Sequence, residues 1–291
     1  MTSKNVGETI KAIRKNKQMK QTEFSSVKQG TLANIESSKR IPYYTTFESI
    51  LLDIDMTAYE FNYVQNGFHL SEREQLIQDF IKCKHSLYSN QINTLQNQIE
   101  AYLVKNPEDT HIENLLVIMH VYQKINKEQT YNIDSPESKK IWERIDSQEV
   151  WYYNDIFTMS RLFYVFPMPL AKRIIKKVLE HYEVYDNYQN ITASKIAFLL
   201  NSGKFFNFHR LYTEAHPLLQ EAKRLAYEEE LPMLEFAADY ALAVIAHVNG
   251  NCELAQNEID RVCTVLTMIN RPLLENDIRR DWNLFLAGHP N

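Results

Sequence analysis

The sequence predicts an all-α protein, with an N-terminal domain of five short helices followed by a C-terminal α-solenoid of helical hairpins. Glycine is scarce, with six in 291 residues, and residues common in helices are abundant. No long stretch alternates strictly between apolar and polar residues, as a half-buried strand does. From residue 66 on, helical patterns of roughly 14 to 20 residues follow one another, divided by polar breaks.

The charge is divided unevenly along the chain. The net charge is −5, but residues 1–42 hold nine Lys or Arg and three Glu, a net charge of +6, which leaves −11 for the remainder. A basic head on an acidic body is typical of a nucleic-acid contact confined to the N-terminal segment.

The composition also indicates the cellular compartment. The three cysteines, Cys83, Cys252 and Cys263, include no C-x-x-C pair, which favours a reducing environment. The polar start MTSKNVGET does not read as a signal peptide, and no run approaches the roughly 18 apolar residues of a membrane span. We therefore expect a cytoplasmic protein.

The first expected helix carries an apolar stripe of Val6, Ile10 and Ile13. Basic side chains fall largely outside this stripe, where they can meet phosphates: Lys11, Arg14, Lys15 and Lys17. This helix therefore has one face for a core and another for solvent or a polyanion.

Residues 20–42, KQTEFSSVKQGTLANIESSKRIP, predict two short helices joined by a tight turn. In the second helix, Leu32 and Ile35 can point inward. Four polar side chains then face outward: Lys28, Gln29, Thr31 and Asn34. Gln and Asn match the major-groove edge of adenine, and Lys39 and Arg40 follow where a DNA backbone would lie. The pattern indicates a helix-turn-helix; the alternative is a small helical hairpin with a solvated face.

Two further helices complete the head. Apolar side chains at helical spacing give the fourth helix its buried face and close the fifth: Phe47, Ile50, Leu51, Ile54 and Phe61. Asn66-Gly67 is a turn signal, and Ser71 with Glu74 predicts a capping box for the next helix. We therefore predict one domain at 1–65 and a second at 66–291.

The order of these elements, with ANIESSKRIP and FESILLDIDMTAYEF, resembles the repressor-like helix-turn-helix of the Rgg/GadR/MutR transcription regulators of Gram-positive bacteria. Glu36 stands where that family keeps an acidic residue at the end of its recognition helix. The chain departs from the family at Ser38, where Gly is frequent, and at Asn34, where a basic residue is frequent.

The resemblance implies a DNA-binding head, and the outward-facing residues are its candidates. We expect Gln29 and Asn34 to read bases and the basic members to hold phosphates. The predicted DNA-binding set is Arg14, Gln21, Lys28, Gln29, Thr31, Asn34, Lys39 and Arg40.

The C-terminal third of the chain is the most repetitive. Residues 196–226 and 241–268 each predict a helix, a glycine-containing turn (Ser202-Gly203 or Asn249-Gly250) and a second helix. The second hairpin has the small-residue placing of a tetratricopeptide-like repeat, with a unit of roughly 45 residues. Such hairpins stack into a curved solenoid with a concave surface.

WYYNDIFTMSRLF resembles a segment that helps line the ligand groove of Rgg-type regulators, with Arg161 as its basic member and Ser160 as the polar neighbour. A guanidinium there can hold a peptide carboxylate or backbone carbonyls through two parallel contacts. Alternatively, Arg161 pairs with Asp155 and only joins two helices.

Further ligand candidates come from the repeat helices and the aromatic side chains. Asn201 and Tyr240 lie near the inner ends of repeat helices, where an Asn can clasp a peptide backbone. The alternative for Asn201 is a helix cap beside Ser202-Gly203, and the alternative for the aromatics is the core between helices. The predicted ligand-binding set is Phe157, Ser160, Arg161, Asn201, Phe205 and Tyr240.

No sequence pattern points to catalysis, a metal or a cofactor. The glycines form no phosphate cradle, and the chain has no H-E-x-x-H, no Cys/His cluster and no G-x-S-x-G elbow. Cys83 and His85 are two apart and point to different sides of a helix. We expect no enzyme, no cofactor and no metal site.

The sequence therefore predicts a DNA-binding transcription regulator whose C-terminal repeats sense a ligand and form a homodimer. The resemblance implies quorum sensing, with a short hydrophobic peptide pheromone and operator DNA as partners and no membrane. A dimer would present two heads to half-sites one DNA turn apart, or a multiple of that. Two alternatives stay open: a regulator of the same build that answers acid or another stress, and a protein-interaction module whose head does not bind DNA.

Overall fold

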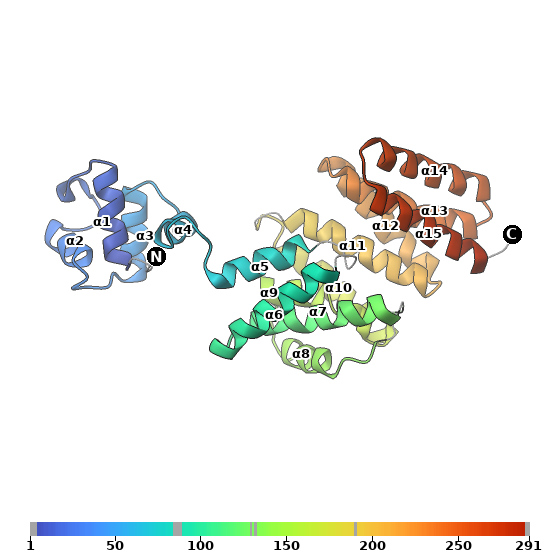
Figure 1. Ribbon diagram of the computed structural model, residues 1–291, viewed down its shortest axis with the longest axis horizontal. Coiled ribbons are helices and arrows are strands. Elements are labelled where there is room, and N and C mark those ends of the chain that lie inside the picture. Colours follow the sequence, from blue (N-terminus) through green and yellow to red (C-terminus); the bar gives the residue numbers. More distant parts are fainter. Residues whose placement is uncertain (1–4, 84–88, 129, 131–132, 189–190, 289–291) are drawn as a thin grey trace. The chain divides into compact units, whose positions relative to one another are not determined.

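The computed structural model describes residues 5–83, 89–128, 130, 133–188 and 191–288. Every regular element in these ranges is a helix, which confirms the predicted all-α class (Figure 1). The chain divides into two compact units, 1–116 and 117–291. The predicted boundary at residue 65 instead separates the helix-turn-helix head from everything that follows it. It stays a prediction.

The first unit opens with the predicted head of five helical segments. They are α1 (Val6–Asn16), the 3-10 helix η1 (Gln21–Glu23), α2 (Gln29–Glu36), α3 (Tyr44–Asp53) and α4 (Ala58–Gln65). The first helix of the predicted hairpin is thus a single 3-10 turn. α5 (Glu72–Lys82) and α6 (Ser89–Lys105) follow and pack against each other, and α7 (Thr110–Glu128) begins in this unit.

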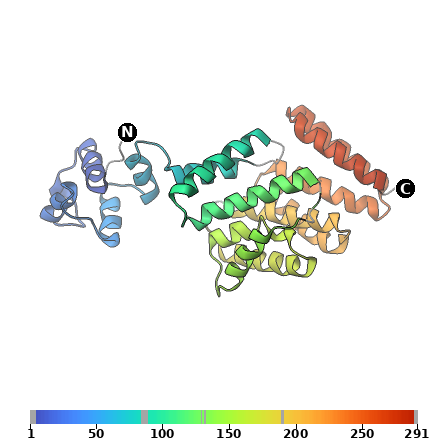
Figure 2. The same ribbon diagram turned by 60° about the horizontal axis from the view of Figure 1, so that its bottom comes forward.

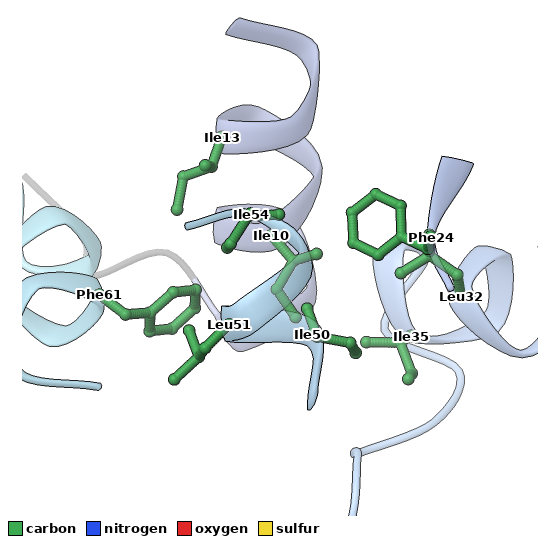
Figure 3. Close-up of a cluster of buried hydrophobic side chains, with 9 residues drawn as sticks. All are labelled: Ile10, Ile13, Phe24, Leu32, Ile35, Ile50, Leu51, Ile54 and Phe61. Carbon is green, nitrogen blue, oxygen red and sulfur yellow. The ribbon is translucent and has the colours of Figure 1, made fainter. Parts of the chain in front are cut away.

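Nine buried side chains form the core of the head (Figure 3). They come from α1, α2, α3, α4 and the adjoining loops: Ile10, Ile13, Phe24, Leu32, Ile35, Ile50, Leu51, Ile54 and Phe61. The ring of Phe61 also meets Phe47 edge to face, with ring centroids 5.0 Å apart. Burying one such side chain contributes about 1.5–3 kcal/mol, so this core holds α2 firmly against the other helices.

Gly7 allows α1 to approach α2 closely. A Cβ atom on Gly7 would lie 1.9 Å from the backbone oxygen of Ile35, far inside van der Waals contact. Gly30, at the start of α2, would have nothing within 4 Å of such an atom. The two glycines look alike in the sequence, and only the packing separates them.

The chain leaves the head as predicted. Gly67 has φ +72° in the turn after α4, which confirms the turn signal. The predicted capping box at the start of α5 is also confirmed, because Ser71 N–H donates to Glu74 Oε2 at 3.0 Å and Glu74 N–H donates to Ser71 Oγ at 3.2 Å.

The second unit contains the rest of α7 and the helices that follow it. They are α8 (Pro136–Asp146), α9 (Tyr153–Met159), the 3-10 helix η2 (Phe163–Val165), α10 (Met168–Val184), α11 (Ile191–Phe208), α12 (Tyr212–Glu228), α13 (Pro232–Val248), α14 (Cys252–Met268) and α15 (Pro272–Gly288). From α11 on, each helix packs against the next, and α11 also contacts α13 (Figure 2). This sequential packing is that of the predicted helical-hairpin solenoid.

The last four helices repeat at a fixed interval. They begin 20 residues apart, at Tyr212, Pro232, Cys252 and Pro272. Each turn before them holds one residue of positive φ: Arg210 (58°), Glu230 (53°), Gly250 (87°) and Asn270 (55°). The next N–H then closes on the preceding helix, as from Leu211 to the carbonyl oxygen of Phe206 at 2.8 Å, which is the Schellman closure of a helix end.

Two expectations about the repeats are wrong. Ser202-Gly203 is no turn, because α11 runs unbroken to Phe208. A Cβ atom on Gly203 would lie 2.4 Å from Leu219 Cδ2, so this glycine serves close packing of α11 on α12. The hairpin unit is also shorter than predicted, since α13 and α15 begin 40 residues apart, at Pro232 and Pro272.

A buried carboxylate joins three successive helices of the solenoid. Asp239 on α13 is 1% exposed. It pairs with Lys223 of α12 at 2.6 Å and with Arg261 of α14. Because removing one partner of a buried ion pair strands the other charge, such a group fixes how neighbouring helices pack.

Two features were not found among the described residues. Within the described ranges, no helix is long and apolar enough to cross a membrane. In the same ranges, no group of three or more His, Cys, Asp or Glu side chains is placed to hold a metal ion.

Candidate nucleic-acid interface and ligand site

The second helix of the helix-turn-helix, α2, turns a polar face to solvent. Leu32 and Ile35 are 0% and 1% exposed, and this burial fixes which side of α2 faces outward. Thr31 is half-buried at the edge of that face. Five of the predicted DNA-binding residues are exposed on α2 or just beside its ends: Lys28, Gln29, Asn34, Lys39 and Arg40. Two amides and three cations are the chemistry that base edges and phosphates require.

The last residue of α2, Glu36, is a buried carboxylate held from two sides. It accepts hydrogen bonds from Arg14 through both oxygens, with Nη2–Oε2 at 2.8 Å, and from Gln21 Nε2 at 2.9 Å. Burial disfavours its charged form, but the hydrogen bonds from Arg14 and Gln21 outweigh burial and lower the pKa of Glu36. In return, the hydrogen bond to Glu36 raises the pKa of Arg14.

Arg14 and Gln21 are therefore committed inside the free protein. The Arg14 side chain is 11% exposed, and its Nη1 also donates to the carbonyl oxygen of Met19 at 2.8 Å. The contact of these two residues with DNA stays a prediction. Their geometry gives them a positioning role, because they tie α1 and η1 to the end of α2.

A second carboxylate, that of Asp53 at the end of α3, also holds the helix-turn-helix together, and the sequence analysis did not identify it. It accepts the N–H groups of Ser25 and Ser26 at 3.3 and 3.1 Å, and also both serine hydroxyls. Burial opposes the charge, yet these hydrogen bonds hold the pKa of Asp53 below its ordinary value. These hydrogen bonds fix the turn from η1 to α2. No sequence pattern could have paired two turn serines with an aspartate in another helix.

Ser38, where the chain departs from the resemblance, has φ +60°. That left-handed conformation favours glycine, which gives a physical reason for the glycine frequent there in the family. Here the Ser38 hydroxyl donates to Asn5 Oδ1 at 3.0 Å, and the same oxygen caps α1 by accepting the N–H of Glu8 at 2.9 Å. Serine thus keeps the turn that leads Lys39 and Arg40 past the end of α2.

Two tyrosines that the sequence analysis did not single out extend this surface. Tyr43 and Tyr44 are each 72% exposed. The Arg40 guanidinium lies 5.8 Å from the centroid of the Tyr43 ring. Tyrosine hydroxyls donate to DNA phosphates, so these two residues join the candidate interface; two adjacent aromatics in a polar stretch were the only sequence signal.

In the second unit, Arg161 follows α9 and lies against two other predicted ligand residues. Its guanidinium is 3.6 Å from the centroid of the Phe157 ring. Its Nη1 donates to the Phe157 carbonyl oxygen at 2.9 Å and to Ser160 Oγ at 3.1 Å. The alternative partner, Asp155, instead accepts the N–H of Tyr152 at 3.0 Å. Phe157, Ser160 and Arg161 therefore form one cluster, with Phe157 and Ser160 buried.

The other three predicted ligand residues lie on α11 and α13. Phe205 is 1% exposed and packs edge-on against Phe163, so it belongs to the core between helices. Asn201 is exposed in the middle of α11 and is therefore no helix cap. Tyr240 is half-buried, and its burial raises its pKa. A ligand contact for each of them stays a prediction.

Three tyrosines missed by the sequence analysis lie within electrostatic reach of Arg161. They are Tyr122 on α7, Tyr153 at the start of α9 and Tyr182 on α10. Burial raises the pKa of each phenol, and the positive charge of Arg161 opposes that rise. Only folding brings these distant positions together, so the sequence carried no signal for the cluster.

Comparison with solved structures shows what this arrangement resembles. A proposed transcriptional regulator from Listeria monocytogenes EGD-e matches with a TM-score of 0.75 and 19% identity, over 97% of each chain. The SHP pheromone receptor Rgg2 of Streptococcus dysgalactiae matches with a TM-score of 0.68 and 13% identity, over 96% of this chain and 100% of that chain. PlcR of Bacillus thuringiensis, solved with the peptide PapR7 and DNA, also matches with a TM-score of 0.68 and 13% identity, over 94% of this chain and 98% of that chain.

The chain has the fold of these regulators. The predicted architecture, a helix-turn-helix head followed by helical repeats, is thereby confirmed. Neither a protein-family profile nor a curated protein matches the sequence. Since unrelated functions can share a fold, the function has to be argued from the site.

Proposed function

We propose that this protein is a DNA-binding transcription regulator of the Rgg type whose C-terminal repeats respond to a short peptide. The observation that carries the proposal is the exposed surface at α2, where Gln29 and Asn34 lie on the helix and three cations lie beside its ends. Glu36 holds the end of this helix, and Asp53 holds the turn before it. Its fold is that of PlcR, which was solved with a peptide and DNA. It is also that of Rgg2, a pheromone receptor.

The work of the interface is divided between two kinds of side chain. Gln29 and Asn34 carry paired donors and acceptors that match the edge of adenine in the major groove. Lys28, Lys39 and Arg40 flank them and neutralise phosphates, which supplies affinity without sequence preference. Because α2 is only eight residues long, its orientation depends on the hydrogen bonds of Glu36 at its end and of Asp53 to the turn before it.

The regulatory part of the proposal rests on two states of the protein. A ligand changes the DNA affinity only if it binds one arrangement of the heads more tightly than another. In a homodimer, two heads meet two half-sites, so a ligand that changes their separation changes operator binding. The predicted cytoplasmic location follows from this role.

The test is a selection of genomic fragments from the source organism by the purified full-length protein at moderate salt. The proposal predicts that one or a few sequences are enriched and that a scrambled duplex competes at least a hundredfold less well. Equal, weak retention of all fragments contradicts it and favours the protein-interaction module.

A further inference from the structure

The head carries its charges in two separate parts of its chain. Residues 1–42 have a net charge of +6, whereas residues 52–68 hold three acidic residues and no Lys or Arg, a net charge of −3. This acidic segment forms the end of α3, the whole of α4 and the turns on either side of α4. Because DNA phosphates repel carboxylates, the surface around α4 is suited to a partner other than DNA.

Three exposed aromatic rings form a continuous surface on α4 and in the turn after it. Tyr59 and Tyr63, which are 62% and 39% exposed, lie four residues apart on α4 and therefore share a face. Phe68 is 64% exposed and meets Tyr63 edge to face, with ring centroids 6.1 Å apart. We call Tyr59, Tyr63 and Phe68 the α4 aromatic face. Exposed aromatic side chains of this kind are enriched at protein interfaces.

Phe68 keeps this exposed place in spite of its backbone conformation. Its φ is +63°, directly after Gly67 at +72°, and a bulky residue is rare in the left-handed region. The Phe68 N–H donates to the carbonyl oxygen of Tyr63 at 2.9 Å, which holds the ring beside α4. An apolar ring that is both strained and solvated gains little in the free protein, and a partner that covers it would stabilise it.

Two carboxylates accompany the α4 aromatic face. Asp55 lies in the turn before α4, and Glu60 follows Tyr59 on the helix; both side chains are exposed. In the part of the chain that the structure describes, neither forms an ion pair, whereas Asp53 is held by two serine hydroxyls. A partner that covers the rings therefore has to bring its own cations to these two carboxylates.

Charge also argues against two other occupants of this face. Residues 66–291 carry a net charge of −7, so the rest of the chain is not complementary to it. A second copy that paired through the same face would bring Asp55 and Glu60 of both copies together, and like charges across an interface are unfavourable. The face fits a different protein, one that is apolar and basic.

The proposed function places one such protein beside the head. A protein that binds promoter DNA neutralises phosphates with Lys and Arg, so RNA polymerase bound next to an operator presents basic surface close to that DNA. We propose that the α4 aromatic face docks on a basic, apolar surface of promoter-bound RNA polymerase, and that this contact activates transcription. The inference rests on the proposed function and adds to it a partner and the direction of regulation.

The test is a reporter gene in the source organism, behind a promoter that carries the operator selected by the protein. Operator occupancy is measured in the same cells by chromatin immunoprecipitation. The wild type is expected to activate the reporter relative to a deletion strain. Tyr59→Ser and Glu60→Lys are each expected to lower this activation by about fivefold or more at unchanged occupancy, because aromatic anchors and charge pairs determine such contacts.

Occupancy verifies that the head of each variant is folded. Tyr227→Ser and Glu229→Lys are the matched controls, because they make the same changes at exposed positions at the end of α12. Both controls should activate as the wild type does.

A cross-link identifies the partner and decides the case in which a variant loses occupancy. Tyr59 is replaced by benzoylphenylalanine in the full-length protein, the cells are irradiated, and the adduct is identified by mass spectrometry. We expect a subunit of RNA polymerase. An adduct with a second copy of this chain, an adduct with another protein, or no adduct overturns the inference.

The reporter can overturn it as well. Repression by the wild type, no effect of the wild type on the reporter, or full activation by both Tyr59→Ser and Glu60→Lys contradicts the inference while operator occupancy leaves the proposed function standing. Conversely, a cross-link to RNA polymerase by a protein that selects no operator overturns the proposed function alone.

Discussion

Glu36 receives hydrogen bonds from Arg14 and Gln21, which come from different helices and lie 22 and 15 residues away in the chain. The resemblance located the acid at the end of the recognition helix. It did not reveal the partners, because the sequence pattern of an amphipathic helix does not distinguish a solvated basic residue from one buried against a carboxylate. At this scale, residue types and faces were predictable, and specific pairings across the fold were not.

Glu36→Gln is expected to lower the stability of the head by about 2–4 kcal/mol, because it leaves the Arg14 guanidinium without an anion. Amide hydrogen exchange of α1 and α2 in the full-length protein measures this change. Glu8→Gln, an exposed acid on α1, is the control and leaves exchange nearly unchanged.

The same pair predicts a pH dependence. Since the pKa of Glu36 is lowered on folding, its contribution is fully present above the ordinary pKa of about 4.3 and is lost as the pH falls through the folded value. The stability gap between the wild type and Glu36→Gln should therefore be full at pH 7 and shrink on acidification. A gap that widens on acidification contradicts this assignment.

At the scale of the helices, glycine has two roles: it allows two helices to pack closely, or it occupies a turn of positive φ. The sequence indicated the turn at Asn249-Gly250 because glycine marks it, but it misled at Ser202-Gly203, where glycine serves packing inside α11. Three equivalent turns use Arg210, Glu230 and Asn270. The 20-residue interval was therefore hidden, since the backbone conformation repeats while the residue type does not.

Gly7→Ala is expected to destabilise the head by about 1–3 kcal/mol or more, because the new methyl group meets the backbone oxygen of Ile35. Gly30→Ala fills open space on a helix and should instead stabilise by about 0.5–1 kcal/mol. Thermal unfolding and amide hydrogen exchange in α2 are measured for both variants, and the opposite signs of the two stability changes distinguish them. Equal effects would show that α1 and α2 are not in close contact.

The repeated turns give a paired prediction. Glu230→Gly relieves a left-handed non-glycine residue and should stabilise the second unit by about 1 kcal/mol, whereas Gly250→Ala should destabilise it by a similar amount. Urea unfolding monitored by tryptophan emission tests both, since every tryptophan lies in that unit. Opposite signs are required, and shifts in the same direction count against a shared turn geometry.

For the whole molecule, the all-α class and the succession of a helix-turn-helix head and helical repeats were predictable, because hydrophobic periodicity and turn signals act along the chain. The cluster of Tyr122, Tyr153, Tyr182 and Arg161 was not, since its members come from α7, α9, α10 and the segment after α9. The proposed function requires both parts: a head that reads DNA and a repeat unit that responds to a ligand.

The most direct test of the central claim is the binding of full-length variants to the selected operator and to a scrambled duplex, each at several salt concentrations. Gln29→Ala and Asn34→Ala should each lose about 1–3 kcal/mol of discrimination between the two duplexes. Lys39→Ala should weaken both alike and reduce the salt slope by about 1. Asn62→Ala, an exposed amide on α4, should change neither. If discrimination and salt slope were the same in all four variants as in the wild type, α2 would not be the DNA-reading helix.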